Sequence, residues 1–237
     1  MNINNKKALV FGGTSGIGLA TTQQLSMLGA DVIAIGRHPE KLSSPPANTK
    51  VMACDVLDRE SLQALFAECA VDGSIDILVS AATGGQRAIG PFTDMDMDGY
   101  QASFDKLWGY TNVVRYGLAY LSQSASIVLV SGSPARQCNP GQIALSSVGG
   151  AVEAFVRGVA KEISPKRINT VSPGLIDTPM VDLEGKERDQ HYEKLTANNL
   201  IPRAGTADEV AQGIIFAIQN DFVTGTTIDV DGGILLS

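Results

Sequence analysis

The sequence contains no run of basic residues, and its net charge is −7, with 18 lysines and arginines against 25 aspartates and glutamates. Nucleic acids and anionic membrane surfaces attract clustered positive charge, so neither is expected as a partner. We also find no apolar stretch of about 20 residues that would span a bilayer. Residues 1–6 lack the apolar core of a signal sequence. These absences favour a protein that works away from membranes.

Cysteine is scarce as well. Cys54, Cys69 and Cys138 are far apart and do not have the spacing of metal ligands, so we predict no metal site. An odd number of cysteines without a signal sequence is typical of reduced thiols, and we expect a cytoplasmic protein. The length of 237 residues suits a single α/β domain over residues 1–237, with enough material for a buried core.

A glycine-rich turn between an apolar strand and a helix lies near the start of the chain. Residues 8–11 predict a buried parallel strand, and residues 17–28 predict a helix. Gly12 permits a tight turn, Gly16 lets the backbone approach a phosphate, and Gly18 lets the helix pack against the strand. The first amides of such a helix are unpaired and attract an anion. The segment predicts a dinucleotide-binding loop; the alternative is a turn that binds nothing.

Strands and helices alternate along the rest of the chain, without an internal repeat or a domain-sized linker. This order predicts a Rossmann-like α/β fold, in which a doubly wound parallel sheet of about seven strands lies between two helical layers. The expected strands are 8–11, 32–35, 51–54, 76–79, 126–130, 167–171 and 227–230, and the expected helices are 17–28, 58–70, 95–121, 142–163 and 206–219. The polar residues 181–200 are expected to form a mobile segment on the substrate side.

The end of the second strand indicates which dinucleotide fits. Folds of this kind usually place an acidic residue there to hold the ribose hydroxyls, and a carboxylate repels a 2′-phosphate. This chain has Gly36 and then Arg37, whose guanidinium suits a phosphate. Thr14 and Ser15 can add hydroxyl donors. We therefore predict NADP(H), with NAD(H) less favoured; the alternative is that Arg37 is a solvent-exposed residue of a turn.

The Gly-x-x-x-Gly-x-Gly spacing of residues 12–18 resembles the first loop of the short-chain dehydrogenase/reductase family, with Phe11 in place of the usual threonine. The resemblance covers the whole chain. Residues 55–56 resemble the pair that contacts adenine, residues 80–83 match the family's Asn-Asn-Ala-Gly turn only in part, and residues 172–178 resemble the segment that cradles the nicotinamide. The cofactor-binding residues thus expected are Gly12, Thr14, Ser15, Gly16, Ile17, Gly18, Arg37, Asp55, Val56, Ala82, Pro173, Gly174, Ile176 and Thr178.

The resemblance implies an oxidoreductase with a small carbonyl or alcohol substrate. It also implies a homodimer or homotetramer, formed through the helices near 95–121 and 142–163. The family's catalysis, however, depends on a tyrosine with a lysine four residues later. In an alignment without gaps, Leu145 occupies the tyrosine position and Gly149 the lysine position. Leucine has no proton to give, and glycine has no charge that would lower a tyrosine pKa.

Gly149 and Gly150 should each destabilise a helix by roughly 1 kcal/mol relative to alanine. We interpret the two glycines as leaving space beside the nicotinamide for another group, such as the long side chain of Lys106. Residues 104–109 resemble the segment that contains the family's Asn-Leu-x-Gly motif, and Lys106 occupies the position of its asparagine. A lysine partly buried beside a cofactor has a lowered pKa and can stabilise or protonate a developing alkoxide.

Other interpretations of these residues stay open. Lys106 could instead reach solvent, or pair with Asp98 or Asp105. The family's catalytic serine falls between Ser131 and Ser133, which are candidates for holding a substrate oxygen or for ordinary capping of a strand end. The loop of residues 136–139 is expected to line the substrate side.

Two functions are compatible with this sequence. One is an NADP(H)-dependent oxidoreductase with non-standard proton-handling residues. The other is a catalytically silent NADP(H)-binding protein, acting as a redox sensor or as an inert partner subunit. Both retain the glycine loop and Arg37, so the sequence does not separate them.

Overall fold

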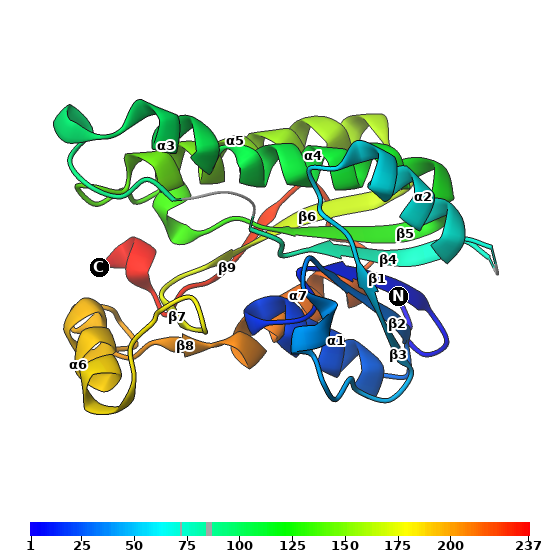
Figure 1. The fold of residues 1–237 in the computed structure, drawn as a ribbon, viewed down its shortest axis with the longest axis horizontal. Coiled ribbons are helices and arrows are strands. Elements are labelled where there is room, and N and C mark those ends of the chain that lie inside the picture. Colours follow the sequence, from blue (N-terminus) through cyan, green and yellow to red (C-terminus); the bar gives the residue numbers. More distant parts are fainter. Residues whose placement is uncertain (72, 84–86) are drawn as a thin grey trace.

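Seven parallel strands form one sheet in the computed structural model, which describes residues 1–71, 73–83 and 87–237 (Figure 1). The strand order is β3-β2-β1-β4-β5-β6-β9, which confirms the predicted doubly wound topology. The strands are β1 (Lys7–Phe11), β2 (Asp31–Gly36), β3 (Thr49–Ala53), β4 (Ile75–Ser80), β5 (Leu121–Val130), β6 (Arg167–Pro173) and β9 (Thr227–Val230).

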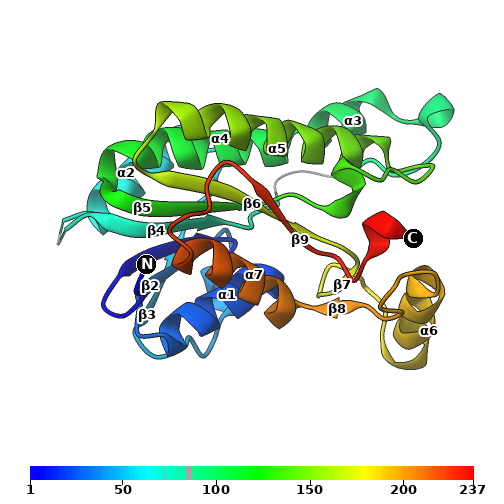
Figure 2. The same cartoon turned by 180° about the vertical axis from the view of Figure 1, so that it is seen from behind.

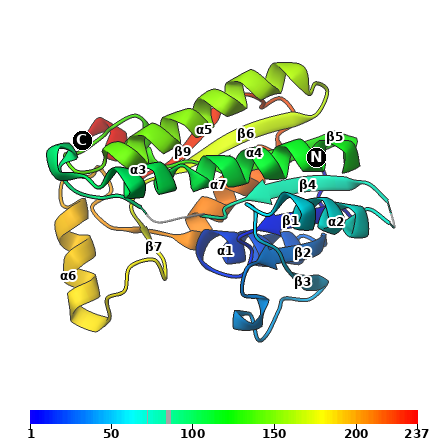
Figure 3. The same ribbon diagram turned by 45° about the horizontal axis from the view of Figure 1, so that its top comes forward.

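Helices cover both faces of the sheet, so the fold has three layers (Figures 1 and 2). One face carries α1 and α7, and the other carries α2, α4 and α5, as the tilted view also shows (Figure 3). The helices are α1 (Gly16–Met27), α2 (Arg59–Cys69), α3 (Met97–Ser103), α4 (Asp105–Gly117), α5 (Ile143–Glu162), α6 (Gly185–Thr196) and α7 (Ala207–Gln219). A capping box formed by Thr206 and Glu209 opens α7.

The strand β1 shows how the sheet fills two cores. Its side chains alternate between the faces, as the pleat requires. Ala8 and Val10 belong to the apolar cluster beneath α1 and α7, whereas Leu9 and Phe11 belong to the cluster beneath α2, α4 and α5. All four residues are fully buried. A strand buried on both faces therefore appears in the sequence as a continuous apolar run.

The single helix expected over residues 95–121 is wrong. The structure divides it into α3 and α4 at Phe104, where the backbone N–H donates to the carbonyl of Gln101 and makes a tighter turn than an α-helix allows. The strand β5 also begins earlier than expected, because Leu121 already pairs with Ile75 before the register shifts. Such a shift is a β-bulge, which sequence periodicity does not reveal.

The polar segment 181–200 contains a helix, α6, which the sequence analysis did not predict. Only Tyr192 and Thr196 of this helix are buried, so it has no apolar stripe. Arg188 fixes its start, because the guanidinium pairs with Asp177 and donates to the carbonyl of Thr178 at 2.9 Å. Next to α6, the short strands β7 (Ile176–Asp177) and β8 (Gly205–Thr206) pair in parallel.

The expectation that no stretch could span a membrane needs one correction. By length and composition alone, α5 is long and apolar enough to cross a bilayer. In this fold α5 lies against the sheet, and its side chains Val148, Val152 and Val156 are buried. The buried valines therefore account for part of its apolar character.

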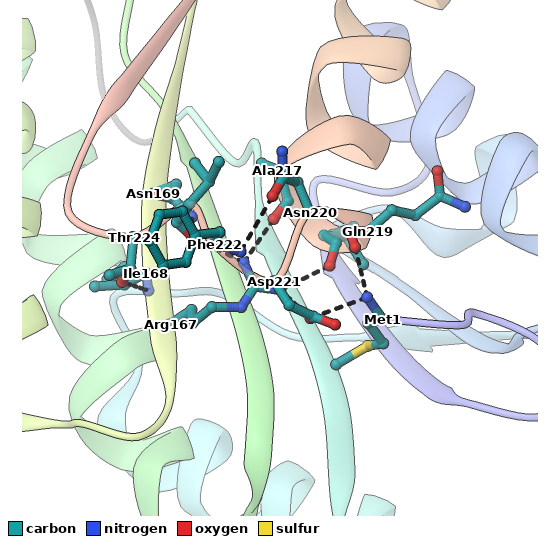
Figure 4. Close-up of polar contacts among 12 residues, drawn as sticks. Met1, Arg167, Ile168, Asn169, Ala217, Gln219, Asn220, Asp221, Phe222 and Thr224 are labelled. Atoms are coloured by element: carbon teal, nitrogen blue, oxygen red, sulfur yellow. Dashed lines mark hydrogen bonds and ion pairs between the residues drawn. The ribbon is translucent and has the colours of Figure 1, made fainter.

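Arg167 joins the end of α7 to the sheet (Figure 4). Its guanidinium donates to the carbonyls of Ala217 at 2.8 Å, Ile218 at 2.7 Å and Val223 at 3.0 Å, and the residue is 8% exposed. The last carbonyls of a helix have no partner within the helix, and Arg167 supplies one. The carboxylate of Asp221 lies 3.5 Å from this guanidinium.

We expect Arg167→Met to lower the free energy of unfolding by about 3 kcal/mol, because buried carbonyls lose charge-assisted donors. The corresponding fall in the melting temperature is roughly 10 °C for a chain of this length. Thermal unfolding measured by circular dichroism tests this, with Arg157→Met on the exposed side of α5 as the control. A change of less than about 2 °C in the Arg167 variant would contradict this role of the side chain.

Candidate functional site

One cleft of about 590 Å³ opens at the carboxyl ends of β1, β4, β5 and β6. The chain order of the sheet reverses there, between β1 and β4, and α/β folds bind ligands at such a point. The structure brings all the expected cofactor-binding residues and the three catalytic candidates to this cleft, together with Leu145 and Gly149. These are Gly12, Thr14, Ser15, Gly16, Ile17, Gly18, Arg37, Asp55, Val56, Ala82, Lys106, Ser131, Ser133, Leu145, Gly149, Pro173, Gly174, Ile176 and Thr178.

The glycine loop brings the start of α1 against the end of β1. A Cβ on Gly18 would lie 2.0 Å from the carbonyl oxygen of Gly12, so no side chain fits there. Gly12 itself has φ +76°, in the left-handed region that favours glycine. The first turn of α1 contains no acidic residue, and its N-cap Ser15 makes no side-chain capping bond. By contrast, Asp58 caps α2. The amides of α1 are thus available to an anion in the cleft.

A contact between Thr14 and Gly36 explains the missing acidic residue at the end of β2. A Cβ on Gly36 would lie 2.6 Å from Oγ1 of Thr14, so the threonine occupies the space where a longer side chain would begin. Arg37 is exposed, and it lines this end of the cleft with His38 and Lys41. This end is therefore positively charged and favours a phosphate over ribose hydroxyls alone.

The segment after β3 is held from the far side by α4. Nδ2 of Asn112 donates to the carbonyl of Val56 at 3.0 Å. Gly109 makes this approach possible, because its Cβ would lie 2.5 Å from a methyl carbon of Val56. Asp55 accepts a bond from the backbone N–H of Leu57 at 3.0 Å, which fixes its carboxylate at the wall of the cleft.

Lys106 lies in the interior of the cleft. Its Nζ donates to the backbone carbonyl of Ser131 at 3.0 Å and lies 5.7 Å from the ring centroid of Tyr110. Burial, with a smaller contribution from the positive charge of Arg87, lowers the pKa of Lys106 to about 7. Within the described residues Lys106 makes no ion pair, so the alternative pairing with Asp98 or Asp105 is wrong.

The neighbouring serines are both buried, with Ser131 7% and Ser133 6% exposed. The hydroxyl of Ser131 donates to Oε1 of Glu153 at 3.2 Å, and Arg136 pairs with the same carboxylate at 3.4 Å. Ser133 opens a 3₁₀ turn, and its carbonyl accepts from the backbone N–H groups of Arg136 and Gln137, which follow the turn. The sequence analysis missed Glu153, although an acid on an otherwise apolar helix face is a detectable signal.

The interpretation of Gly149 as space for Lys106 is wrong. A Cβ on Gly149 would lie 2.9 Å from Cβ of Ala135, so the 3₁₀ turn over Ser133–Ala135 fills this space. Gly149 is needed because this turn packs directly on α5. Leu145 lines the cleft one turn earlier and presents only hydrocarbon to it.

Tyr110 also lines the cleft, and it does not replace the missing tyrosine. Its side chain is fully buried, and its hydroxyl donates to the carbonyl of Val130 at 3.0 Å. Burial raises the pKa of this hydroxyl well above its ordinary value. A phenol that is engaged in this way cannot exchange its proton readily near neutral pH.

Several lining residues were outside the sequence prediction. Arg87 and Met180 approach each other across the cleft, with Nη2 3.4 Å from Sδ. Of the expected residues 136–139, Gln137 and Asn139 line the cleft, whereas the Arg136 side chain points to Asp229 and Glu153. Arg87 lies in a connection without periodicity, where a sequence pattern gives no signal.

Comparison with known proteins identifies relatives along the full chain. A family model described as "Enoyl-(Acyl carrier protein) reductase" matches residues 12–235. The 3-oxoacyl-[acyl-carrier-protein] reductase of Thermotoga maritima is 32% identical over 254 residues, covering 100% of both chains. Carbonyl reductase family member 4 of Danio rerio is 30% identical over 243 residues, covering 98% of this chain and 99% of its own.

Solved structures of related proteins also match the full chain. A small-chain dehydrogenase in complex with NADPH has a TM-score of 0.82 and 30% identity, with 99% of this chain and 100% of that chain covered. ElxO with NADP bound has a TM-score of 0.88 and 25% identity, with 98% and 100% covered.

Proposed function

Since this chain belongs to the short-chain dehydrogenase/reductase family, we propose that it is an NADP(H)-dependent oxidoreductase that interconverts a small carbonyl compound and its alcohol. The observation that carries the proposal is that the open amides of α1, Arg37 and Lys106 line one continuous cleft. An anion-binding end and a group with a pKa of about 7 thus occur together in one site. The NADP(H) complexes of two structural relatives support the choice of cofactor.

The residues present fit a phosphorylated dinucleotide. The first amides of α1 would hold the pyrophosphate, as helix N-termini hold anions. Arg37 would hold the 2′-phosphate, and Thr14 keeps a competing carboxylate out of that place. Asp55 and Val56 would lie along the adenine, and the Pro173–Thr178 segment along the nicotinamide. The bound cofactor supplies the hydride chemistry, which depends on positioning more than on any one side chain.

In this proposal Lys106 takes over the handling of the proton. With a pKa of about 7, its ammonium can release a proton near neutral pH, as an efficient general acid must. The carbonyl of Ser131 fixes Nζ from one side. The buried Ser131 hydroxyl, held by Glu153, is a positioning group rather than a free donor. Ser133 stays a candidate for holding the substrate oxygen.

A second function is favoured by one observation. Leu145 and Gly149 occupy the positions of the family's tyrosine and lysine, and both line the cleft. A protein that binds NADP(H) without turnover would have such a site. To separate the two functions, NADPH fluorescence is titrated first, and NADPH oxidation is then measured across a panel of aldehydes and ketones. Binding with no oxidation across the panel would support the silent protein.

Arg37→Gln is expected to weaken NADPH binding by roughly 10- to 100-fold, because the 2′-phosphate loses a charge-assisted partner. Binding of NADH, which lacks this phosphate, should hardly change, so it serves as the internal control. Both affinities are measured by fluorescence titration of the same variant. Equal effects on NADPH and NADH, or no effect on either, would remove Arg37 from phosphate recognition.

We also propose that the protein is a homodimer or homotetramer formed through α4 and α5. Trp108 of α4 is 56% exposed, and a large apolar side chain of this kind is typical of an interface. For the compartment we propose the cytoplasm. All three cysteines are free thiols, which supports a reducing environment.

A further inference from the structure

The cleft has an uneven charge distribution at its substrate end. The cationic residues there are Arg87 and Lys106, which line the cleft together with Leu145, Val148 and Met180. The only carboxylate among the described residues lining the cleft is that of Asp55, which lies at the adenine end. The sequence also places no acidic residue at positions 84–86, just before Arg87. The substrate end of the cleft is therefore lined by positive charge, whereas Asp94 and Asp96 line a separate, smaller pocket that Arg87 also borders, and Glu153 is already paired with Arg136.

Arg87 has few hydrogen-bond partners among the residues that the structure describes. A guanidinium carries five N–H groups, and within these residues the partner of Arg87 is the sulfur of Met180, a weak acceptor. Within the described residues Arg87 makes no ion pair. Although part of the side chain is exposed, the walls of the cleft desolvate it and lower the pKa of Arg87. No ion pair within the described residues offsets this partial desolvation, and an anion that enters the cleft would do so.

The two cations also repel each other. The charge of Arg87 contributes to the lowered pKa of Lys106, so the groups are close enough to interact. They differ in what they can hold. The planar fork of Arg87 suits two oxygens of a carboxylate, whereas Lys106 is a point charge that can exchange a proton. Arg87 also reaches Met180, two residues beyond Thr178, from the opposite wall of the cleft.

We infer that the substrate carries a carboxylate, and that Arg87 binds this carboxylate while Lys106 faces the carbonyl oxygen. The substrate class is thus that of small oxo acids and the corresponding hydroxy acids. A carboxylate suits this end because the planar fork of Arg87 presents two donors side by side, and Leu145, Val148 and Ile234 offer apolar contacts to the rest of a small molecule. This inference rests on the proposed function, because it names the substrate of the same site.

The test uses the whole protein and pairs of ligands in which a methyl ester replaces the charged carboxylate. Pyruvate, acetoacetate and levulinate are each compared with their methyl esters, since these acids separate the carbonyl and the carboxylate by different lengths. Binding to the protein saturated with NADP⁺ is measured by calorimetry, and reduction is measured by NADPH oxidation. We expect at least one acid to bind roughly 10- to 100-fold more tightly than its ester.

In Arg87→Gln this preference for the acid should disappear, mainly through a higher KM, while Arg87→Lys should retain part of it. Arg115→Gln, the same loss of charge on the exposed side of α4, should leave it unchanged. The inference is overturned if no acid binds better than its ester, or if Arg87→Gln keeps the preference, whether or not it weakens NADPH binding. Failure of the wild-type protein to bind NADPH would instead refute the proposed function.

Discussion

Replacing Lys106 with methionine is expected to lower the turnover of carbonyl reduction by roughly 100-fold or more, which is the usual contribution of a general acid. Methionine keeps much of the length and apolar volume of the lysine stem and removes the proton. The ammonium of Lys106 has a pKa of about 7, which lies near neutrality, and it lines the substrate end of the cleft. NADPH affinity should change little, because the groups proposed to hold the phosphates are the amides of α1 and the guanidinium of Arg37, and not Lys106. Steady-state kinetics and a fluorescence titration measure the two effects separately.

The same role of Lys106 predicts how the rate of reduction changes with pH. Reduction needs the protonated form of Lys106, so the wild-type kcat/KM for reduction should fall as the pH rises above about 7. The fall should be absent from the residual activity of Lys106→Met. A wild-type profile that is flat between pH 6 and 9, together with unchanged turnover in the variant, would exclude Lys106 as the proton donor.

Stability offers an independent readout of the same pKa. The folded-state pKa of Lys106 is lowered from 10.5 to about 7, so between these values the unfolded chain binds a proton that the folded chain has lost. The free energy of unfolding should therefore rise with pH across this window through this group. Lys106→Met should remove that contribution to the slope in urea unfolding experiments, even if the protein has no catalytic activity at all.

Local signals explain why most of the fold was predictable. Each buried strand of the parallel sheet is a short apolar run, and Asp58 and Thr206 mark helix starts through their own side chains. The errors have an equally physical origin. A tight turn at Phe104 leaves the helical periodicity on both sides intact, so the sequence shows one helix where there are two. The helix α6 was not predicted, because it buries only two side chains and so has no apolar periodicity.

The candidate site divides in the same way. The glycine loop was predictable, because the spacing of its three glycines is typical of a tight turn in which a helix starts close to the end of a strand. The contacts of Gly36 with Thr14 and of Gly149 with Ala135 join residues from separate elements, and only the folded chain shows them. The second contact reversed an interpretation, since a turn and not a lysine fills the space beside Gly149. Arg87, in an irregular connection, became visible only through the cleft that it lines.

Gly18→Ala is expected to abolish measurable NADPH binding and to destabilise the fold, although it adds a single methyl group. Its Cβ would lie 2.0 Å from the carbonyl oxygen and 2.6 Å from the carbonyl carbon of Gly12, and both are backbone atoms that cannot rotate away. The loop and the start of α1 must separate, at a cost of about 3 kcal/mol or more. If that strain falls on the phosphate-binding geometry, the affinity falls by roughly 100-fold or more.

A matched control for this change exists within the chain. Gly158 lies in α5, and a Cβ there would have no atom outside its own helix within 4 Å. Gly158→Ala should therefore stabilise the protein by up to about 1 kcal/mol, the ordinary difference between glycine and alanine in a helix. Opposite shifts of the melting temperature in the two variants, with NADPH binding lost only in Gly18→Ala, would tie the affinity to the contact between α1 and the loop. Normal NADPH binding by Gly18→Ala would refute the assignment of this loop to the phosphates, because the amides could not then depend on the close approach that Gly18 permits.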